Sequence, residues 1–182
     1  ISLSNDAKKI NAINCIYKKN NQLKGKNTDW YGFIKSLNHN NIDLQDYNII
    51  IIGAGGVSKS VIYSLQKEEI KNFQIYNRTN IDNFKVGQQI YNTLQLRELE
   101  KNIPSDTLMI NCTSLGVIEN NNILSKKILK NVKVFYDLNY HEPKFYSILK
   151  NKDIQIIGGL DMLIYQAIKS IELWFNQEII GK

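Results

Sequence analysis

The sequence has few cysteines, and this scarcity limits the kinds of protein that it can encode. Its two cysteines, Cys15 and Cys112, lie far apart in a chain of 182 residues. Two thiols build neither a disulfide framework nor a metal site of recognisable spacing. We therefore interpret both as small core residues, predict no metal site, and expect a reducing cytoplasm as the location.

Long apolar runs and blocks of like charge are also missing. No stretch reaches the roughly 18 apolar residues that cross a membrane, and no charged-then-apolar leader opens the chain. The formal net charge is +6, but the lysines are scattered singly or in pairs rather than gathered in one run. A solvated surface explains this pattern better than a nucleic-acid interface does. We predict neither nucleic acid nor a membrane as a partner.

What the sequence does contain is an alternation of strand and helix patterns. The run "NIIII" at residues 48–52 is typical of a parallel strand that is buried on both faces. We predict further strands at 72–79, 106–114, 132–140 and 154–159, and helices at 56–67 and 162–175. This order predicts an α/β fold with a doubly wound parallel sheet. Residues 18–25 are predicted to form a polar turn, whereas residues 88–94 fit either a short strand or a helix.

A glycine-rich loop, "GAGGVS" at residues 53–58, joins the first of these strands to a helix. In such a loop the first glycine permits a tight turn, the next lets a pyrophosphate approach the backbone, and the helix N-terminus favours the anion. The third motif position is Ser58 rather than Gly or Ala. Because strand, loop and helix follow one another directly, we favour a dinucleotide site over a plain turn.

The end of the next strand indicates which dinucleotide this is. Sites for NAD usually offer an acid there to the ribose 2′-hydroxyl, but this chain has Asn77, Arg78 and Thr79. A guanidinium binds a 2′-phosphate through two hydrogen bonds, whereas a carboxylate would repel it. We therefore predict NADP as the cofactor. The alternative is that Arg78 is an ordinary solvated side chain.

Asp29 stands at the start of a predicted helix, within "GKNTDWYGF". Apolar residues follow it at the spacing of one helix face, from Trp30 to Leu37. An acid at this position can simply complement the helix dipole. It can also be an acid–base group placed near a cofactor. The helix pattern alone leaves both interpretations open.

Seven segments, in order, resemble those of shikimate dehydrogenases. They span about residues 7 to 176 and read "INAINCI", "GKNTDWYGF", "IIGAGGVSKSV", "YNRT", "INCTSLG", "YDLNYHEP" and "GGLDMLIYQAIKSIELW". The family reversibly reduces 3-dehydroshikimate to shikimate with NADPH, in aromatic amino-acid (chorismate) biosynthesis. The resemblance implies a Rossmann-like NADP-binding domain over 41–160, a remnant of an N-terminal α/β substrate domain over 1–40, and a C-terminal helix over 161–182 that packs back toward it. We expect a monomer or homodimer.

The resemblance also implies a role for individual residues. Asp29 is the expected catalytic residue, and the expected substrate-binding residues are Asn14, Thr28, Asp29, Tyr140 and Gln166. The residues expected to bind the cofactor come from the glycine loop and from the ends of the later strands. They are Gly53, Ala54, Gly55, Gly56, Val57, Asn77, Arg78, Thr79, Asn111, Thr113, Ser114, Leu138, Gly159 and Leu163.

The chain departs from the family pattern in two places. The family's catalytic lysine and its Ser-x-Ser carboxylate clamp lie upstream of the segment that matches Ile1, so we expect the C-terminal two-thirds of such an enzyme. Lys24 and Lys26 do not match the lysine motif, and Asp82 stands near the place of a second basic residue after "NRT". Two alternatives follow: a dinucleotide-binding module without catalysis, and a relative that oxidises quinate or uses NAD.

Overall fold

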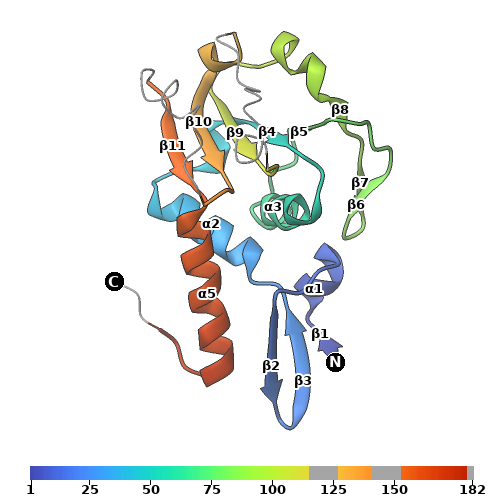
Figure 1. The fold of residues 1–182 in the computed structure, drawn as a ribbon, viewed down its shortest axis with the longest axis vertical. Helices are drawn as coiled ribbons and strands as arrows, with labels where there is room; N and C mark the ends of the chain where they lie inside the picture. Colours follow the sequence, from blue (N-terminus) through green and yellow to red (C-terminus); the bar gives the residue numbers. More distant parts are fainter. Residues whose placement is uncertain (115–126, 141–152, 180–182) are drawn as a thin grey trace.

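A six-stranded parallel sheet is the centre of the fold in the computed structural model, which describes residues 1–114, 127–140 and 153–179 (Figure 1). The spatial order is β11-β10-β9-β4-β5-β8, and every neighbouring pair is parallel. The order reverses between β4 and β9, which confirms the predicted doubly wound α/β fold. The strands are β4 (Asn48–Ile52), β5 (Phe73–Asn77), β8 (Leu94–Gln95), β9 (Thr107–Asn111), β10 (Val132–Asp137) and β11 (Gln155–Gly158).

Both faces of this sheet are buried. Ile49 and Ile51 of β4 belong to one apolar cluster, which includes side chains of α2 (Asp29–His39), α3 (Gly56–Lys67) and α5 (Leu160–Phe175). Ile50 and Ile52 belong to the opposite cluster, with side chains of the short 3₁₀ helices η2 (Leu96–Lys101) and η3 (Ile128–Lys130). Because successive strand residues point to opposite faces, a strand covered on both sides is apolar throughout.

A smaller, three-stranded sheet in the order β1-β3-β2 stands apart from the large one (Figure 1). It contains β1 (Ser2–Leu3), β2 (Cys15–Lys19) and β3 (Gln22–Lys26), and α1 (Asn5–Ile10) lies between β1 and β2 in the chain. The polar turn predicted over 18–25 is therefore too long, because its two ends belong to β2 and β3. Only Asn20 and Asn21 form the turn, both with positive φ, as a two-residue hairpin loop requires.

The remaining elements complete the large sheet's surroundings. The sequence of residues 88–94 fitted either a short strand or a helix. In the structure these residues contain a strand, β7 (Gln89–Tyr91), which pairs antiparallel with β6 (Phe84–Val86). A 3₁₀ turn, η1 (Leu44–Asp46), precedes β4.

The ends of two motif segments, residues 115–116 and 141–143, lie outside the described residues. None of the helices in the described parts of the chain is long and apolar enough to cross a membrane.

Residues on both sides of the predicted boundary at residue 40 belong to one apolar cluster. Phe33 and Leu37 of α2 share one apolar cluster with Ile49 and Ile51 of β4. Helix α5 packs along α2, as Figure 1 shows. The division of the chain into three segments stays a prediction.

Candidate active site

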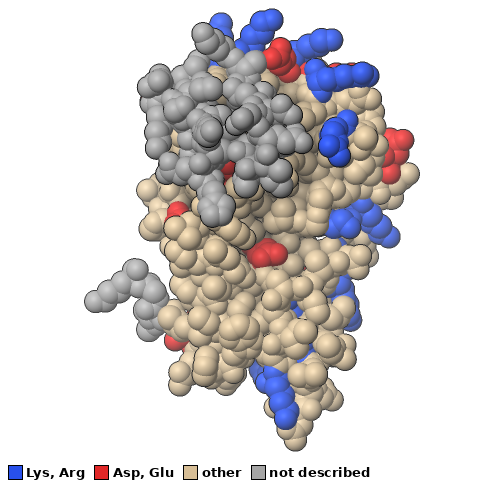
Figure 2. Space-filling view, in the orientation of Figure 1, with Lys and Arg blue, Asp and Glu red and all other residues tan. Residues whose placement is uncertain are grey.

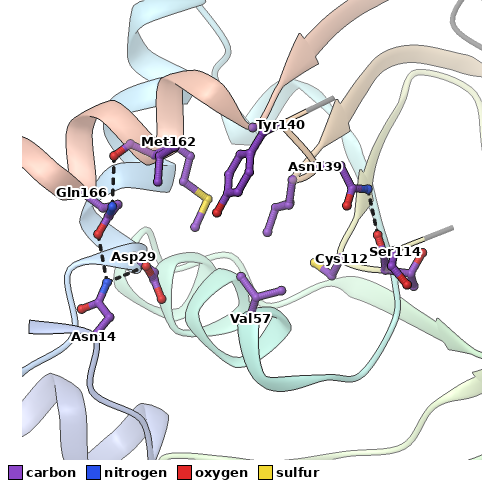
Figure 3. A pocket seen from close by; sticks show the side chains of 13 residues that line it. Asn14, Asp29, Val57, Cys112, Ser114, Asn139, Tyr140, Met162 and Gln166 are labelled. Atoms are coloured by element: carbon purple, nitrogen blue, oxygen red, sulfur yellow. Dashed lines mark hydrogen bonds between the residues drawn. The ribbon is translucent and has the colours of Figure 1, made fainter. Parts of the chain in front are cut away.

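A cavity of about 590 Å³ opens at the carboxyl ends of the parallel strands, next to the point where the strand order reverses (Figure 3). This is where open α/β sheets bind their ligands. Its walls come from the starts of α2 and α3, the loops after β9, β10 and β11, helix α5 and the residue before β2. The lining residues are Asn14, Asp29, Val57, Cys112, Thr113, Ser114, Leu138, Asn139, Tyr140, Gly159, Met162, Leu163 and Gln166.

Three of the predicted substrate-binding residues form a hydrogen-bonded cluster in one wall. Asn14 Nδ2 donates to Asp29 Oδ1 at 2.6 Å and to Gln166 Oε1 at 3.1 Å. Residues 152 positions apart in the chain thus meet, because α5 returns to the start of α2. Tyr140, the fourth, lines the same cavity but is 62% exposed.

Thr28, the fifth predicted substrate-binding residue, does not line the cavity. It is fully buried behind the cluster, where its Oγ1 lies 3.2 Å from Gln166 Oε1 and 3.1 Å from Ser170 Oγ. Thr28 occupies the N-cap position of α2, yet its side chain makes no capping hydrogen bond. Its Oγ1 also lies 3.2 Å from Asn14 Oδ1, so the hydroxyl contacts Asn14 and the neighbouring helix α5 instead of capping its own helix.

Burial raises the pKa of the Asp29 carboxyl above its ordinary value, and hydrogen bonds from Asn14 and Asn27 partly offset this effect. The backbone N–H of Asp29 donates to Asn27 Oδ1 at 3.1 Å. Asn27 is buried and also accepts from Ser60 of α3 at 3.4 Å. The carboxyl group is thus held by side chains on both sides, in surroundings where it ionises less readily than in water.

The opposite wall contains residues that were predicted to bind the cofactor. Val57, Thr113, Ser114 and Leu138 line the cavity there, whereas Gly159 and Leu163 line it at the start of α5, the helix that also carries Gln166. Asn111 does not, but its Oδ1 accepts from both the backbone N and the Oγ1 of Thr113, at 3.1 and 2.6 Å. Asn111 therefore fixes a residue that lines the cavity.

The glycine loop lies beside this wall. Gly53 has a φ of +99°, and a Cβ there would approach Thr113 Cγ2 to 2.6 Å, so this position requires glycine. Gly55 and Gly56 differ, because a Cβ added to either would meet nothing within 4 Å. Ser58 stands at the third motif position in place of Gly or Ala. Its Oγ donates to Gly55 O at 2.6 Å, so the serine stabilises the loop.

The predicted 2′-phosphate residues lie outside the cavity. Asn77 joins the end of β5 to the glycine loop, because its Oδ1 accepts from Ala54 N at 3.3 Å and its Nδ2 donates to Thr79 O at 2.9 Å. Arg78 and Thr79 are exposed. On the face in Figure 2, Lys and Arg side chains lie along the upper and right margins, the side on which Figure 1 places β5 to β8.

Sequence reasoning missed several residues that shape the site. Asp137 is fully buried, and its Oδ1 accepts from Asn111 Nδ2, from Asn139 N and from Asn139 Nδ2. Burial, and secondarily the charge of Asp137, raises the pKa of the Cys112 thiol, which keeps this cavity-lining group neutral. Across the described ranges, no group of three or more His, Cys, Asp or Glu side chains could hold a metal ion.

Gly32 was missed although the sequence carries a signal for it. A glycine inside a helix is unfavourable by about 1 kcal/mol relative to alanine, so it needs a packing reason. Here a Cβ would stand 2.5 Å from Met162 O and 2.9 Å from Gln166 N. Gly32 therefore allows α5 to approach α2 closely enough for Gln166 to reach Asn14.

Comparisons with known proteins identify the family of this chain. The model of the family "Shikimate / quinate 5-dehydrogenase" matches residues 36–139, more than half of the chain. The shikimate dehydrogenase (NADP(+)) of Clostridium beijerinckii is 35% identical over 99% of this chain and 67% of that protein. That of Aquifex aeolicus is 33% identical over 95% of this chain and 64% of that protein.

A solved structure gives the same result. Shikimate dehydrogenase 1 from Peptoclostridium difficile matches all of this chain and 66% of its own, with a TM-score of 0.78 and 30% identity. The chain thus spans about two-thirds of the length of the relatives that it matches. With more than half of its residues in the family model, the chain belongs to the shikimate / quinate 5-dehydrogenase family.

Proposed function

We propose that this chain carries the NADP-binding site and part of the substrate site of a shikimate dehydrogenase, which interconverts 3-dehydroshikimate and shikimate. One observation carries the proposal. The Asn14–Asp29–Gln166 cluster and the residues next to the glycine loop are opposite walls of a single cavity. A cyclic hydroxy acid bound at the first wall would lie against a nicotinamide at the second.

The glycine loop fits the pyrophosphate of a dinucleotide. Gly55 and Gly56 leave open space where a side chain would otherwise stand, and α3 begins there with its N-terminus toward that space. Asn77, Arg78 and Thr79 at the end of β5 would hold the 2′-phosphate. Gly53, Ala54 and Val57 complete the loop, and Leu138, Gly159 and Leu163 would contact the nicotinamide.

The chemistry follows from what each wall supplies. NADP, when bound, supplies or accepts the hydride. Reduction of a ketone builds negative charge on its oxygen, which a hydrogen-bond or proton donor must stabilise. Asp29 would orient the substrate hydroxyl, and Gln166 and Tyr140 would hold its neighbours. None of the described lining residues is a lysine or arginine, so turnover by this chain tests whether Asp29 can act without the lysine that the resemblance implies.

The first experiment is to mix the chain with shikimate and NADP⁺, then with NAD⁺, and to follow the absorbance band of the reduced nicotinamide. We expect shikimate-dependent reduction that is faster with NADP⁺. Faster reduction with quinate than with shikimate would assign the chain to the quinate branch. If NADPH binds but no substrate is oxidised, the module without catalysis is the better description, and absence of NADPH binding would contradict the proposal.

The glycine loop gives a sharper prediction. In Gly55→Ala we expect the affinity for NADPH to fall about tenfold or more, because the added methyl occupies the space where the pyrophosphate would lie. The backbone of Gly55 has a φ of −93°, which alanine adopts without strain, so the melting temperature should not fall. Titration of the intrinsic fluorescence with NADPH measures the affinity.

Gly158→Ala is the matched control. A Cβ at Gly158 also meets nothing within 4 Å, but Gly158 belongs to β11 and does not line the cavity. It should bind NADPH like the wild type. Equal affinities in Gly55→Ala and wild type would place the dinucleotide elsewhere.

A further inference from the structure

Two buried hydroxyl groups meet behind the polar cluster of the cavity. Thr28 Oγ1 and Ser170 Oγ lie 3.1 Å apart, and the two residues are 0% and 6% exposed. Neither lines the cavity, so neither can contact a ligand bound there. Any influence on such a ligand must act through the residues that these hydroxyls hold.

The backbone of Thr28 fixes the orientation of Asn14. The N–H of Thr28 can only donate, and it points at Asn14 Oδ1 at 2.8 Å. The oxygen of this amide is therefore turned toward Thr28. The amide nitrogen of Asn14 must then face Asp29 Oδ1 and Gln166 Oε1, and it donates to both.

The hydroxyl of Thr28 extends this ordering to Gln166. Gln166 Oε1 accepts from Asn14 Nδ2 at 3.1 Å, and it lies 3.2 Å from Thr28 Oγ1. The single proton of the Thr28 hydroxyl is shared between this oxygen and Asn14 Oδ1, also at 3.2 Å, so the hydroxyl holds both amide oxygens on one side. Its Nε2 is consequently turned away and donates one proton to Leu163 O at 3.1 Å. The second proton remains for a ligand in the cavity that Gln166 lines (Figure 3). Ser170 Oγ donates to the backbone carbonyl of Gln166 at 2.9 Å and lies 3.1 Å from Thr28 Oγ1, so it holds the Thr28 hydroxyl beside α5.

We propose that Thr28 is a positioning residue, assisted by Ser170, which turns the amide N–H of Gln166 toward the cavity beside the Asp29 carboxylate. The wall then presents a donor and an acceptor side by side, the pattern that recognises adjacent hydroxyl groups of a polyol. This assignment of the ligand rests on the proposed function. The orientation of the amide does not, and it can be tested separately.

The test compares four variants. Thr28→Val removes the hydroxyl and keeps the shape, whereas Thr28→Ser keeps the hydroxyl and should restore the wild-type behaviour. Ser170→Ala removes the second hydroxyl and replaces Thr28→Val if that protein does not fold. Thr107→Val is the matched control, because Thr107 is also fully buried and its Oγ1 donates to Pro104 O, within the large sheet and away from the cavity.

Calorimetry with shikimate, at saturating NADPH, gives the first readout. We expect Thr28→Val to weaken shikimate binding about three- to tenfold, the usual effect of one hydrogen bond, with NADPH affinity unchanged. Thr28→Ser and Thr107→Val should bind like the wild type. Equal shikimate affinity in Thr28→Val and wild type, or an equal loss in Thr28→Ser, would overturn the proposal.

The second readout does not depend on the ligand. The side-chain amide protons of Gln166, followed by NMR in ¹⁵N-labelled protein, should give two separate signals in the wild type and in Thr28→Ser. In Thr28→Val they should exchange with water much faster, because the amide loses one of the bonds that orient it. If the wild type does not bind shikimate, the proposed function fails, and these signals still decide the role of Thr28: unchanged signals in Thr28→Val would contradict it.

Discussion

Asp29→Asn is expected to lower the rate of shikimate oxidation by about 10²–10⁴-fold, the usual contribution of a positioned acid–base group. The asparagine can keep the hydrogen bond from Asn14 Nδ2, which now joins it to Asp29 Oδ1 at 2.6 Å, so the cluster should persist. It lacks the negative charge and cannot exchange a proton. NADPH affinity should stay within about twofold of the wild type, because Asp29 is on the other wall of the cavity. Steady-state rates with both substrates varied measure these effects.

The same substitution also separates the two interpretations of Asp29 without any need for turnover. If Asp29 served the helix dipole, its charged form would stabilise the protein, and Asp29→Asn would lower the melting temperature at neutral pH. The structure predicts the opposite sign. Burial raises the pKa of Asp29 above 3.8, so the folded protein disfavours the charged form.

The pH dependence follows from this direction. A group whose pKa is raised by folding contributes stability below its unfolded pKa, and this contribution is lost as the pH rises through the folded value. Asp29→Asn should therefore melt at a higher temperature than the wild type at pH 7. The difference should shrink as the pH falls toward 3.8. Asp82→Asn, which removes an exposed carboxylate, is the matched control for the change in charge. A lower melting temperature for Asp29→Asn at pH 7 would favour the dipole interpretation.

Local patterns were sufficient to predict much of the fold. The β-branched run of β4 predicted a parallel strand that is buried on both faces, as observed. The predicted helix at 56–67 has the same bounds as α3, because a glycine loop marks its start and apolar periodicity marks its length. The hairpin of β2 and β3 was missed, since its exposed polar strands lack the alternation that a half-buried strand shows.

The site was predicted only in part, for a different reason. The motifs identified Asn14, Asp29 and Gln166, but the contacts between them join residues up to 152 positions apart. A single sequence does not show which of its distant residues are in contact. The buried hydroxyl of Ser170 meets a partner 142 positions away, so no local pattern distinguishes it from any other serine on a helix. Asp137 was missed for the same reason, since its role depends on Asn139 and Asn111 closing around it.

Gly32→Ala is expected to have the largest effect on stability. A methyl group at this position would stand 2.5 Å from Met162 O and 2.9 Å from Gln166 N, and these backbone atoms can yield only if α5 moves. Overpacking of this kind costs about 1–3 kcal/mol of unfolding free energy, more than the roughly 1 kcal/mol that alanine gains over glycine in a helix. Thermal and denaturant unfolding measure the loss. Gly56→Ala is the stability control, because a Cβ on that helical glycine meets nothing within 4 Å.

The substitution also tests how the cavity is assembled. If α5 is displaced from α2, Gln166 Oε1 moves away from Asn14 Nδ2 and Thr28 Oγ1, and the donor–acceptor pair in the wall is lost. Gly32→Ala should then weaken shikimate binding at temperatures where it is still folded, and more strongly than Thr28→Val, which removes a single hydrogen bond. NADPH binding should change less, because the glycine loop and β5 do not depend on this contact. Unchanged shikimate affinity in a folded, destabilised Gly32→Ala would mean that α5 can shift without carrying Gln166 away, and that the close approach of the two helices serves stability alone.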